Sequence, residues 1–316
     1  MPSRPSHSWT TKVPWLLLLL AGCVWQRTPV AAPAAGQPIA LTAIATERAF
    51  EAQPTPTASQ QAQPPQILTP SATVLVPTLA PTLAPSSQRA YFSTLKLADS
   101  GGASHPVDVG YLLYLPRGYG QEPRRTWPLI LYLHGSEERG EDPDQVRRNG
   151  LPKLLDQGTE LPAIVLSPQC PVGVRWWQNT AALGAVLDLV QSSYAVDSAR
   201  VYVTGWSMGA YGTWALALGY PRRFAALAPI AGGCDFRDDS IPESLCQLRD
   251  VPVWVFHGAQ DRVIAPSESE NAVRAMQACG ADVRFTLYPE ADHDGAWELA
   301  YTDQAFCLWL LQQARL

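Results

Sequence analysis

The chain has 316 residues, 47% of them hydrophobic and 16% charged, and a formal net charge of −5. Because the net charge is mildly negative, the chain lacks the excess of basic residues that is typical of nucleic-acid-binding proteins. The negative charge also disfavours direct attraction to anionic polymers, so it favours a neutral or aryl substrate.

Residues 1–23 predict an export signal, because a basic start precedes a short apolar run, Leu16–Leu20, and small residues before Cys23. The run is too short for a lasting membrane span. Leu20-Ala21-Gly22-Cys23 resembles a bacterial lipobox, so we expect Cys23 to be lipidated and to anchor the protein to a membrane. The expected location is a cell-surface or periplasmic lipoprotein; ordinary cleavage and secretion is the alternative.

Residues 24–88 predict a disordered linker. They contain eleven prolines and only four charged residues, and they lack a periodic apolar face. Such a segment cannot offset the entropy of ordering, and its prolines favour extended conformations. We expect it to hold the next domain away from a membrane surface, or alternatively to form a glycosylated stalk.

Residues 89–316 suffice for one domain with one sizeable core. Apolar strands alternate with helical stretches, which predicts an α/β fold whose mostly parallel central sheet has helices on both faces. The expected elements, in chain order, are an antiparallel edge pair at 91–97 and 107–115, strands at 127–133, 163–167, 200–204, 251–256 and 283–288, and helices at 181–194, 208–218, 267–279 and 297–313.

The most specific motif is Gly205-Trp206-Ser207-Met208-Gly209, which lies between a predicted strand and a predicted helix. Strand, G-x-S-x-G and helix together are typical of the nucleophile elbow of an α/β-hydrolase. The sharp turn exposes the serine Oγ and directs the next backbone N–H at a developing oxyanion. Ser207 is therefore the predicted nucleophile.

In this fold the acid and then the histidine follow the serine along the chain. Asp261 comes just after the predicted strand at 251–256, and His293 comes after the last predicted strand. Both positions face the active-site edge of a parallel sheet. We expect His293, on a loop, to act as general base and acid, and Asp261 to orient its imidazole.

Other residues could fill these roles. His257 is the other histidine beyond Ser207, but we interpret it as a packed or hydrogen-bonded residue at a strand end. Asp292 and Asp294 flank His293, but on a tight loop the side chain of an adjacent residue cannot easily reach the Nδ1 of the histidine. These two aspartates are therefore disfavoured as the catalytic acid. The stronger rivals for the acid are Asp235, Asp238 and Asp239.

The oxyanion hole needs a second N–H from the loop after the strand at 127–133. We expect the amide of Ser136 to pair with that of Met208, and His134 to hold the loop by hydrogen bonds. A metal role for His134 is disfavoured, because no second histidine or cysteine lies at ligand spacing. The predicted chemistry needs neither metal nor organic cofactor.

From about Gly110 onward the chain resembles secreted serine esterases grouped with feruloyl esterases and polyhydroxyalkanoate depolymerases, including the phospholipase/carboxylesterase and predicted-peptidase branch. Segments 133–140, 167–171, 205–209, 257–261 and 292–293 carry the resemblance. Two departures are Glu137 and Ala210, where this branch often has glycine. Glu137 would narrow or charge the cleft mouth, which affects the expected substrate range rather than the reaction.

Aromatic residues predict a wall for a sugar ring or an aryl acyl group. Trp176 and Trp177 follow the strand at 163–167, and we expect one to line the cleft and the other to pack inward. Trp206, beside the nucleophile, is a further candidate for substrate binding, together with Glu137.

The predicted function is therefore a serine carboxylic ester hydrolase acting through an acyl-enzyme, on a small-molecule or polysaccharide-linked ester of the feruloyl or acetyl type. The alternatives are a serine peptidase of the same fold, a polyester depolymerase or phospholipase, and a non-catalytic adhesin that kept the fold.

Five cysteines lie beyond Cys23, an odd number for an exported domain. Cys234 and Cys246 bracket a polar loop with no apolar periodicity, so we predict a disulfide between them. Cys170 is expected to be a buried thiol. The partners of Cys279 and Cys307 stay open, because they depend on helix contacts.

Overall fold

The computed structural model describes residues 86–98, 104–235 and 241–315. The predicted signal (1–23), including Cys23, and nearly all of the predicted linker (24–88) lie outside these residues. In the described part, no helix is both long enough and apolar enough to span a bilayer.

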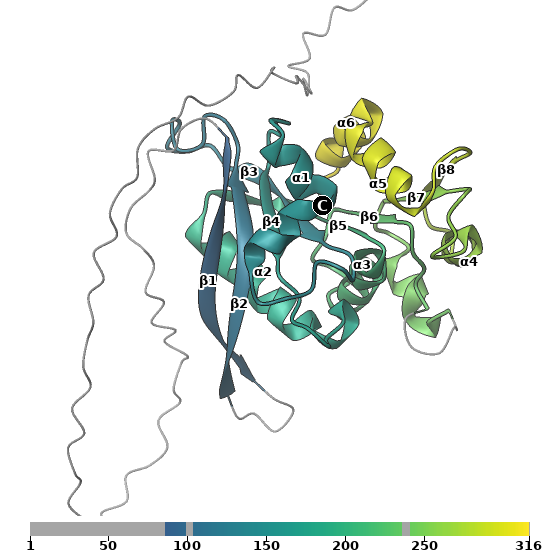
Figure 1. The fold of residues 1–316 in the computed structure, drawn as a ribbon, viewed down its shortest axis with the longest axis horizontal. Helices are drawn as coiled ribbons and strands as arrows, with labels where there is room; N and C mark the ends of the chain where they lie inside the picture. Colours follow the sequence, from purple (N-terminus) through teal and green to yellow (C-terminus); the bar gives the residue numbers. More distant parts are fainter. Residues whose placement is uncertain (1–85, 99–103, 236–240, 316) are drawn as a thin grey trace, which may run out of the picture. The chain divides into compact units, whose positions relative to one another are not determined.

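An eight-stranded sheet forms the centre of the described part (Figure 1), with the strand order β1-β2-β4-β3-β5-β6-β7-β8. β1 and β2 run antiparallel at one edge, β2 is antiparallel to β4, and all the other neighbours are parallel. The strands are β1 (Ser87–Ala98), β2 (Ser104–Leu115), β3 (Trp127–Leu133), β4 (Ile164–Pro168), β5 (Val196–Trp206), β6 (Ala226–Ile230), β7 (Val253–Gly258) and β8 (Val283–Tyr288). This arrangement confirms the predicted fold class.

The connections carry six α-helices and three short 3-10 helices in the described residues. The α-helices are α1 (Gly150–Asp156), α2 (Thr180–Ser193), α3 (Met208–Gly219), α4 (Pro266–Ala278), α5 (His293–Thr302) and α6 (Gln304–Gln312). The 3-10 helices are η1 (Pro143–Arg148), η2 (Trp176–Gln178) and η3 (Glu243–Leu248).

Helices cover both faces of the sheet, and each face has its own apolar core. Side chains of α2, α3 and α4 pack on one face, whereas those of α1, α5 and α6 pack on the other. β3 is buried along its whole length. Its side chains alternate between the cores, with Leu129 and Leu131 on the α2 side and Ile130 and Tyr132 on the α5 side. A strand that is covered on both faces has a continuous run of apolar residues. This is why β3 could be predicted from the sequence.

The chain end differs from the prediction of one helix at 297–313, because two helices occupy this region. Asp292 caps α5, its side chain accepting from the amide of Gly295, and Asp303 caps α6 through the amide of Ala305. An N-cap aspartate satisfies free amides of a first turn. The first cap places His293 at the start of α5 rather than on the predicted loop.

The predicted Cys234–Cys246 disulfide is wrong. Cys246 of η3 is bonded to Cys279, the residue that ends α4, with 5.3 Å between their Cα atoms. Cys234 is a free thiol, completely buried just beyond β6. The pairing follows from the packing of η3 against α4, a contact between distant segments that loop length does not reveal. Cys170 is a buried free thiol, as predicted.

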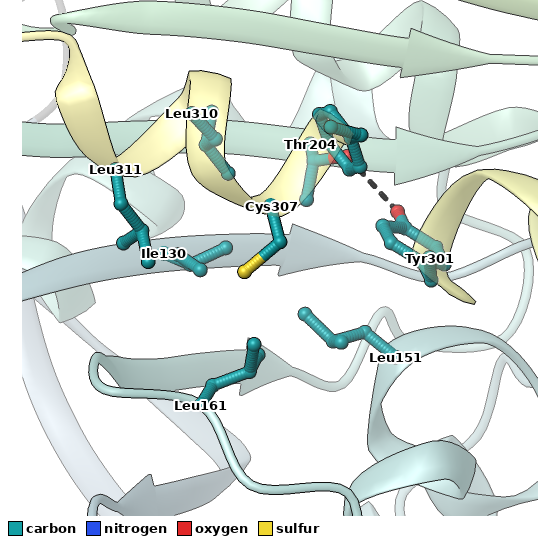
Figure 2. Close-up of a pocket in the computed structure, with 9 residues that line it drawn as sticks. Ile130, Leu151, Leu161, Thr204, Tyr301, Cys307, Leu310 and Leu311 are labelled. Carbon is teal, nitrogen blue, oxygen red and sulfur yellow. Dashed lines mark hydrogen bonds between the residues drawn. The ribbon is translucent and has the colours of Figure 1, made fainter. Parts of the chain in front are cut away.

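A small apolar pocket lies on the α6 side of the sheet, in contact with α1, β3 and β5 (Figure 2). The hydroxyls of Thr204 and Tyr301 on its wall are hydrogen-bonded to each other at 2.9 Å. None of its lining residues belongs to the site built below.

Candidate active site

Ser207 occupies a sharp turn between β5 and α3. Its backbone has φ 57° and ψ −120°, and its amide donates to the carbonyl of Ile230 at 3.0 Å. A positive φ is strained for any residue with a Cβ, and such strain persists only where the surroundings enforce it. Gly209 shows the constraint, because a Cβ at this position would collide with the carbonyl oxygen of Leu133. The side chain of Ser207 stands at the carboxyl end of the strand, as the motif predicts.

Asp261 lies just beyond the end of β7 and is held by four contacts. Its Oδ1 accepts from the amides of Val263 and Ile264 at 2.8 and 2.9 Å, and its Oδ2 faces two histidines. Burial alone would raise the pKa of Asp261, but the hydrogen bonds from His293 and from the two amides outweigh it and hold the pKa below its usual range. This carboxyl group is therefore built to stay ionised.

His293 meets this carboxylate from α5. The distance from His293 Nδ1 to Asp261 Oδ2 is 2.6 Å, which is a short, charge-assisted hydrogen bond. The indole of Trp206 donates to the carbonyl of His293 at 3.0 Å, and the two rings lie 5.1 Å apart. The imidazole is thus fixed between the acid and the residue that precedes Ser207.

Among the described hydrogen bonds there is none between Ser207 Oγ and His293 Nε2. Such contacts are often long in enzymes without substrate and shorten when the complex forms. The aspartates beside His293 are exposed, and Asp292 is occupied as the helix cap. Asp238 and Asp239, two rivals for the acid, lie outside the described residues, and Asp235 is not joined to His293 by any described hydrogen bond.

The loop after β3 is held by His134, which is completely buried. The amide of Cys170 donates to Nε2 at 3.0 Å, so Nε2 has no proton, and Nδ1–H donates to the carbonyl of Gly135 at 2.6 Å. Burial lowers the pKa of His134 to about 4, which keeps this tautomer neutral. The indole N–H of Trp176 binds the carbonyl of His134 at 2.9 Å.

The two residues expected to supply the oxyanion hole flank the elbow from different elements. Ser136 is exposed on the loop after β3, where its carbonyl accepts from Arg139 Nε at 2.9 Å. Met208 is the first residue of α3, so its amide is one of the helix N–H groups without an intrahelical acceptor. Neither backbone amide donates to another group in the described ranges.

A buried carboxyl group supports the same loop. Asn149 donates to Glu138 Oε1, whereas Oε2 has no hydrogen-bond partner among the described residues. Burial is the largest cause of the raised pKa of Glu138. Gln169 Nε2 also donates to the backbone carbonyl of Glu138 at 2.6 Å. Glu137, beside it, is exposed.

One tryptophan of the 176/177 pair packs inward, as expected, and Trp206, a further candidate for substrate binding, is buried as well. Trp176 is completely buried, because its indole supports the His134 loop, and Trp206 is only 4% exposed beneath His293. Trp177 is half-buried, and its ring lies 6.0 Å from that of Tyr211, on α3 one turn beyond Ser207. Tyr211 is not among the residues predicted from the sequence, although its spacing of four residues from Ser207 is a usable signal.

Comparisons with known proteins agree with this geometry. Residues 175–301 match the model of the dienelactone hydrolase family, a range of less than half the chain that includes Ser207, Asp261 and His293. A thermostable esterase of known structure superposes with a TM-score of 0.59 and 29% identity, over 71% of this chain and 63% of that one. This chain has the α/β-hydrolase fold.

Two curated relatives of this chain are named as esterases. It is 26% identical to "Acetylxylan esterase A" of Emericella nidulans over 59% of this chain and 64% of that one. It is 28% identical to "Probable feruloyl esterase C" of Aspergillus terreus over 59% of this chain and 76% of that one. The chain thus spans just under two thirds of the Emericella protein. The relationship to carboxylic ester hydrolases confirms the predicted resemblance to serine esterases.

Proposed function

We propose that this protein is a serine carboxylic ester hydrolase that works through an acyl-enzyme. Ser207 is the nucleophile, His293 the general base and acid, and Asp261 the residue that orients the imidazole. The observation that carries this proposal is the 2.6 Å contact between Asp261 Oδ2 and His293 Nδ1, on an imidazole supported by the neighbour of Ser207. It fixes the tautomer whose free Nε2 can accept a proton.

The first half-reaction follows from this arrangement. His293 Nε2 removes the hydroxyl proton of Ser207 as Oγ bonds to the ester carbonyl carbon. The amides of Ser136 and Met208 stabilise the resulting oxyanion. Collapse of the tetrahedral intermediate breaks the bond to the alcohol oxygen, and the alcohol leaves with the proton held by His293.

Water then completes the cycle. It gives a proton to His293 Nε2 as its oxygen attacks the acyl carbon, and a second tetrahedral intermediate forms in the same oxyanion site. Collapse releases the free acid, and Ser207 regains its proton from His293. Asp261 remains ionised throughout, which its hydrogen bonds to Val263 and Ile264 favour.

The proposed substrates are aryl or glycan-linked esters of the feruloyl or acetyl type. The half-buried ring of Trp177, next to Tyr211, offers an apolar surface near the nucleophile for an aryl acyl group or a sugar. The names of the acetylxylan and feruloyl esterase relatives point to the same classes of ester.

The proposed domain plan is an export signal, a linker and this hydrolase domain, with a lipid on Cys23. The catalytic part would then act at a membrane surface on polymeric or small esters. Cys23→Ser should abolish labelling by a fatty-acid analogue and release active, soluble enzyme. Unaltered labelling of that variant would end the lipoprotein proposal.

A substrate panel tests the activity. Purified wild type is assayed with chromogenic acetate, methyl ferulate, a short polyester, a phospholipid and a set of peptides, with Ser207→Ala as the matched control. Ester cleavage that Ser207→Ala lacks supports the proposal. Peptide cleavage alone would indicate a peptidase of the same fold, and no cleavage with no fluorophosphonate labelling of Ser207 would indicate a non-catalytic protein.

A further inference from the structure

His257 is a second histidine at the carboxylate of Asp261. It lies within β7, is completely buried, and its Nε2 is 3.1 Å from Asp261 Oδ2. His293 Nδ1 reaches the same oxygen at 2.6 Å. Two imidazoles therefore converge on one carboxylate oxygen, from β7 and from α5.

The neighbours of His257 determine where its proton lies. Nε2 faces Asp261 Oδ2 and the carbonyl of Ile264, both at 3.1 Å, and both of these oxygens can only accept. Nε2 must therefore carry a proton and donate it. On the other side, Nδ1 lies 2.7 Å from the hydroxyl of Ser269, a group that can donate as well as accept. A neutral imidazole with its proton on Nε2 satisfies these contacts.

We propose that His257 is a positioning residue for the catalytic acid, an inference that rests on the proposed function. Its Nε2–H donates to Asp261 Oδ2 and holds this oxygen where His293 Nδ1–H also reaches it. The amides of Val263 and Ile264 fix the other oxygen. The carboxylate thus has four donors and one rotational position.

Sharing Oδ2 has an electrostatic consequence. A carboxylate whose charge is partly satisfied by His257 attracts the proton of the His293 imidazolium less strongly than an unshared carboxylate would. His257 therefore favours the neutral His293 that the free enzyme needs for attack. Besides these two histidines and Asp261, the segments around them carry further ionisable side chains that can influence the same titration. They are Cys234, Asp235, Arg262, Glu268, Asp292 and Asp294.

Ser269 also lies close to the loop beside the nucleophile. Its hydroxyl, on α4, is 2.8 Å from the carbonyl of Gly232. The single hydroxyl proton can serve either this carbonyl or His257 Nδ1, and it is directed to Nδ1 when His257 carries its own proton on Nε2. Gly232 packs so closely on the elbow that a Cβ there would lie 3.0 Å from the carbonyl oxygen of Ser207. His257 and Ser269 thus lie between the acid and the loop that borders the nucleophile.

Two variants at this position test the role in the full chain. His257→Leu keeps the volume but removes the donor, whereas His257→Gln can return an N–H near Asp261. We expect kcat of His257→Leu to fall on the order of 10–100-fold. The acid limb of its profile of kcat/KM against pH should move to higher pH, and His257→Gln should recover most of both. His105→Leu, at an exposed histidine of β2, is the control.

A merely structural role would lower activity without moving the pH profile, so a folded His257→Leu with the wild-type profile would overturn the proposal. Circular dichroism and thermal melting establish that the variant is folded. If it does not fold, His257→Gln and the spectroscopy below decide the matter.

Histidine-labelled ¹⁵N NMR of the wild type gives a readout independent of turnover. His257 should carry its proton on Nε2, and Asp261→Asn should shift that resonance. A proton found only on Nδ1 would overturn the inference. An inactive wild type with Nε2-protonated His257 would instead contradict the proposed function and leave this contact intact.

Discussion

The indole of Trp206 donates its only N–H to the backbone carbonyl of His293, so the residue before Ser207 supports the residue proposed as the base. The two rings also pack 5.1 Å apart. Because Trp206 is fixed by β5 and His293 by α5, this contact sets the spacing between the elbow and the imidazole. It joins two segments that are 87 residues apart in sequence.

Trp206→Phe should therefore impair catalysis without unfolding the protein. It keeps an aromatic ring beside His293 but removes the N–H, and a small displacement of the base is expected to lower kcat about tenfold or more. Trp214→Phe is the matched control, because the indole N–H of Trp214 has no hydrogen-bond partner in the described residues. Equal losses in the two variants would show that the hydrogen bond does not position the base.

The proposed triad predicts a steep and ordered loss of activity. Ser207→Ala should lower ester turnover by at least about a thousandfold with folding intact. Asp261→Asn should also be severe, because it removes the charge that stabilises the imidazolium and favours the wrong tautomer. Steady-state kinetics on a chromogenic acetate measures both. Near-normal Asp261→Asn beside inactive Asp235→Asn would move the acid to Asp235.

The stability of the protein should fall between pH 6.5 and about 4 because of His134. Burial lowers its pKa to about 4, so over this interval the unfolded chain binds a proton that the folded chain does not. Stability therefore rises with pH through this window, and His134 alone accounts for up to about 3 kcal/mol of the change.

Urea unfolding at pH 7.5 and pH 4.5 measures this effect. His134→Gln should lower the stability at pH 7.5 and flatten its dependence on pH, whereas His105→Gln, at an exposed site, should leave the wild-type slope. An unchanged slope in His134→Gln would assign the acid sensitivity to other groups, such as His257, whose pKa burial also lowers.

The sequence predicted the strands well and the cysteine pairing poorly, for one physical reason. A strand such as β3 can be predicted from its own run of apolar residues. The conformation of Ser207 can be predicted from the elbow motif, because the steric constraints that determine it are local. The Cys246–Cys279 bond depends on the packing of η3 against α4, which no local pattern encodes. His257 was likewise visible as a strand-end histidine, but its contact with Asp261 appears only once the loop after β7 is folded.

Tryptophan orientation shows the same limit. Adjacent Trp176 and Trp177 have similar sequence surroundings, and the expectation that one packs inward holds for Trp176. Which one does so is decided by the carbonyl of His134, an acceptor on another loop. The cap at Asp292 was readable in principle, because an aspartate precedes the helix that begins at His293.

The disulfide gives a direct chemical prediction. Non-reducing peptide mapping should recover Cys246 linked to Cys279, and Cys234 should react with an alkylating reagent only after denaturation, because it is buried. With a sequence separation of 33 between the partners, Cys246→Ser with Cys279→Ser should cost about 4 kcal/mol of stability in the chain-entropy estimate. A peptide linking Cys234 to Cys246 would contradict the pairing.

Trp177 is expected to select for aromatic acyl groups. Its ring is half-buried beside Tyr211, and the guanidinium carbon of Arg175 lies 5.2 Å from the centre of the ring. Trp177→Ala should raise KM for methyl ferulate by about tenfold, because an aryl acyl group loses a stacking surface worth roughly 0.5–1.5 kcal/mol together with part of its apolar burial. KM for a simple acetate should change little, since an acetyl group is too small to span the ring.

The test of this prediction is the comparison of the KM values for methyl ferulate and for the acetate. A matched control is Phe92→Ala, which removes a ring that is 69% exposed on β1, the edge strand at the opposite end of the sheet from β8. It should leave both KM values unchanged. A parallel rise in KM for ferulate and acetate in Trp177→Ala would indicate a general disturbance of the site around Ser207. No rise for either ester would place the acyl group elsewhere.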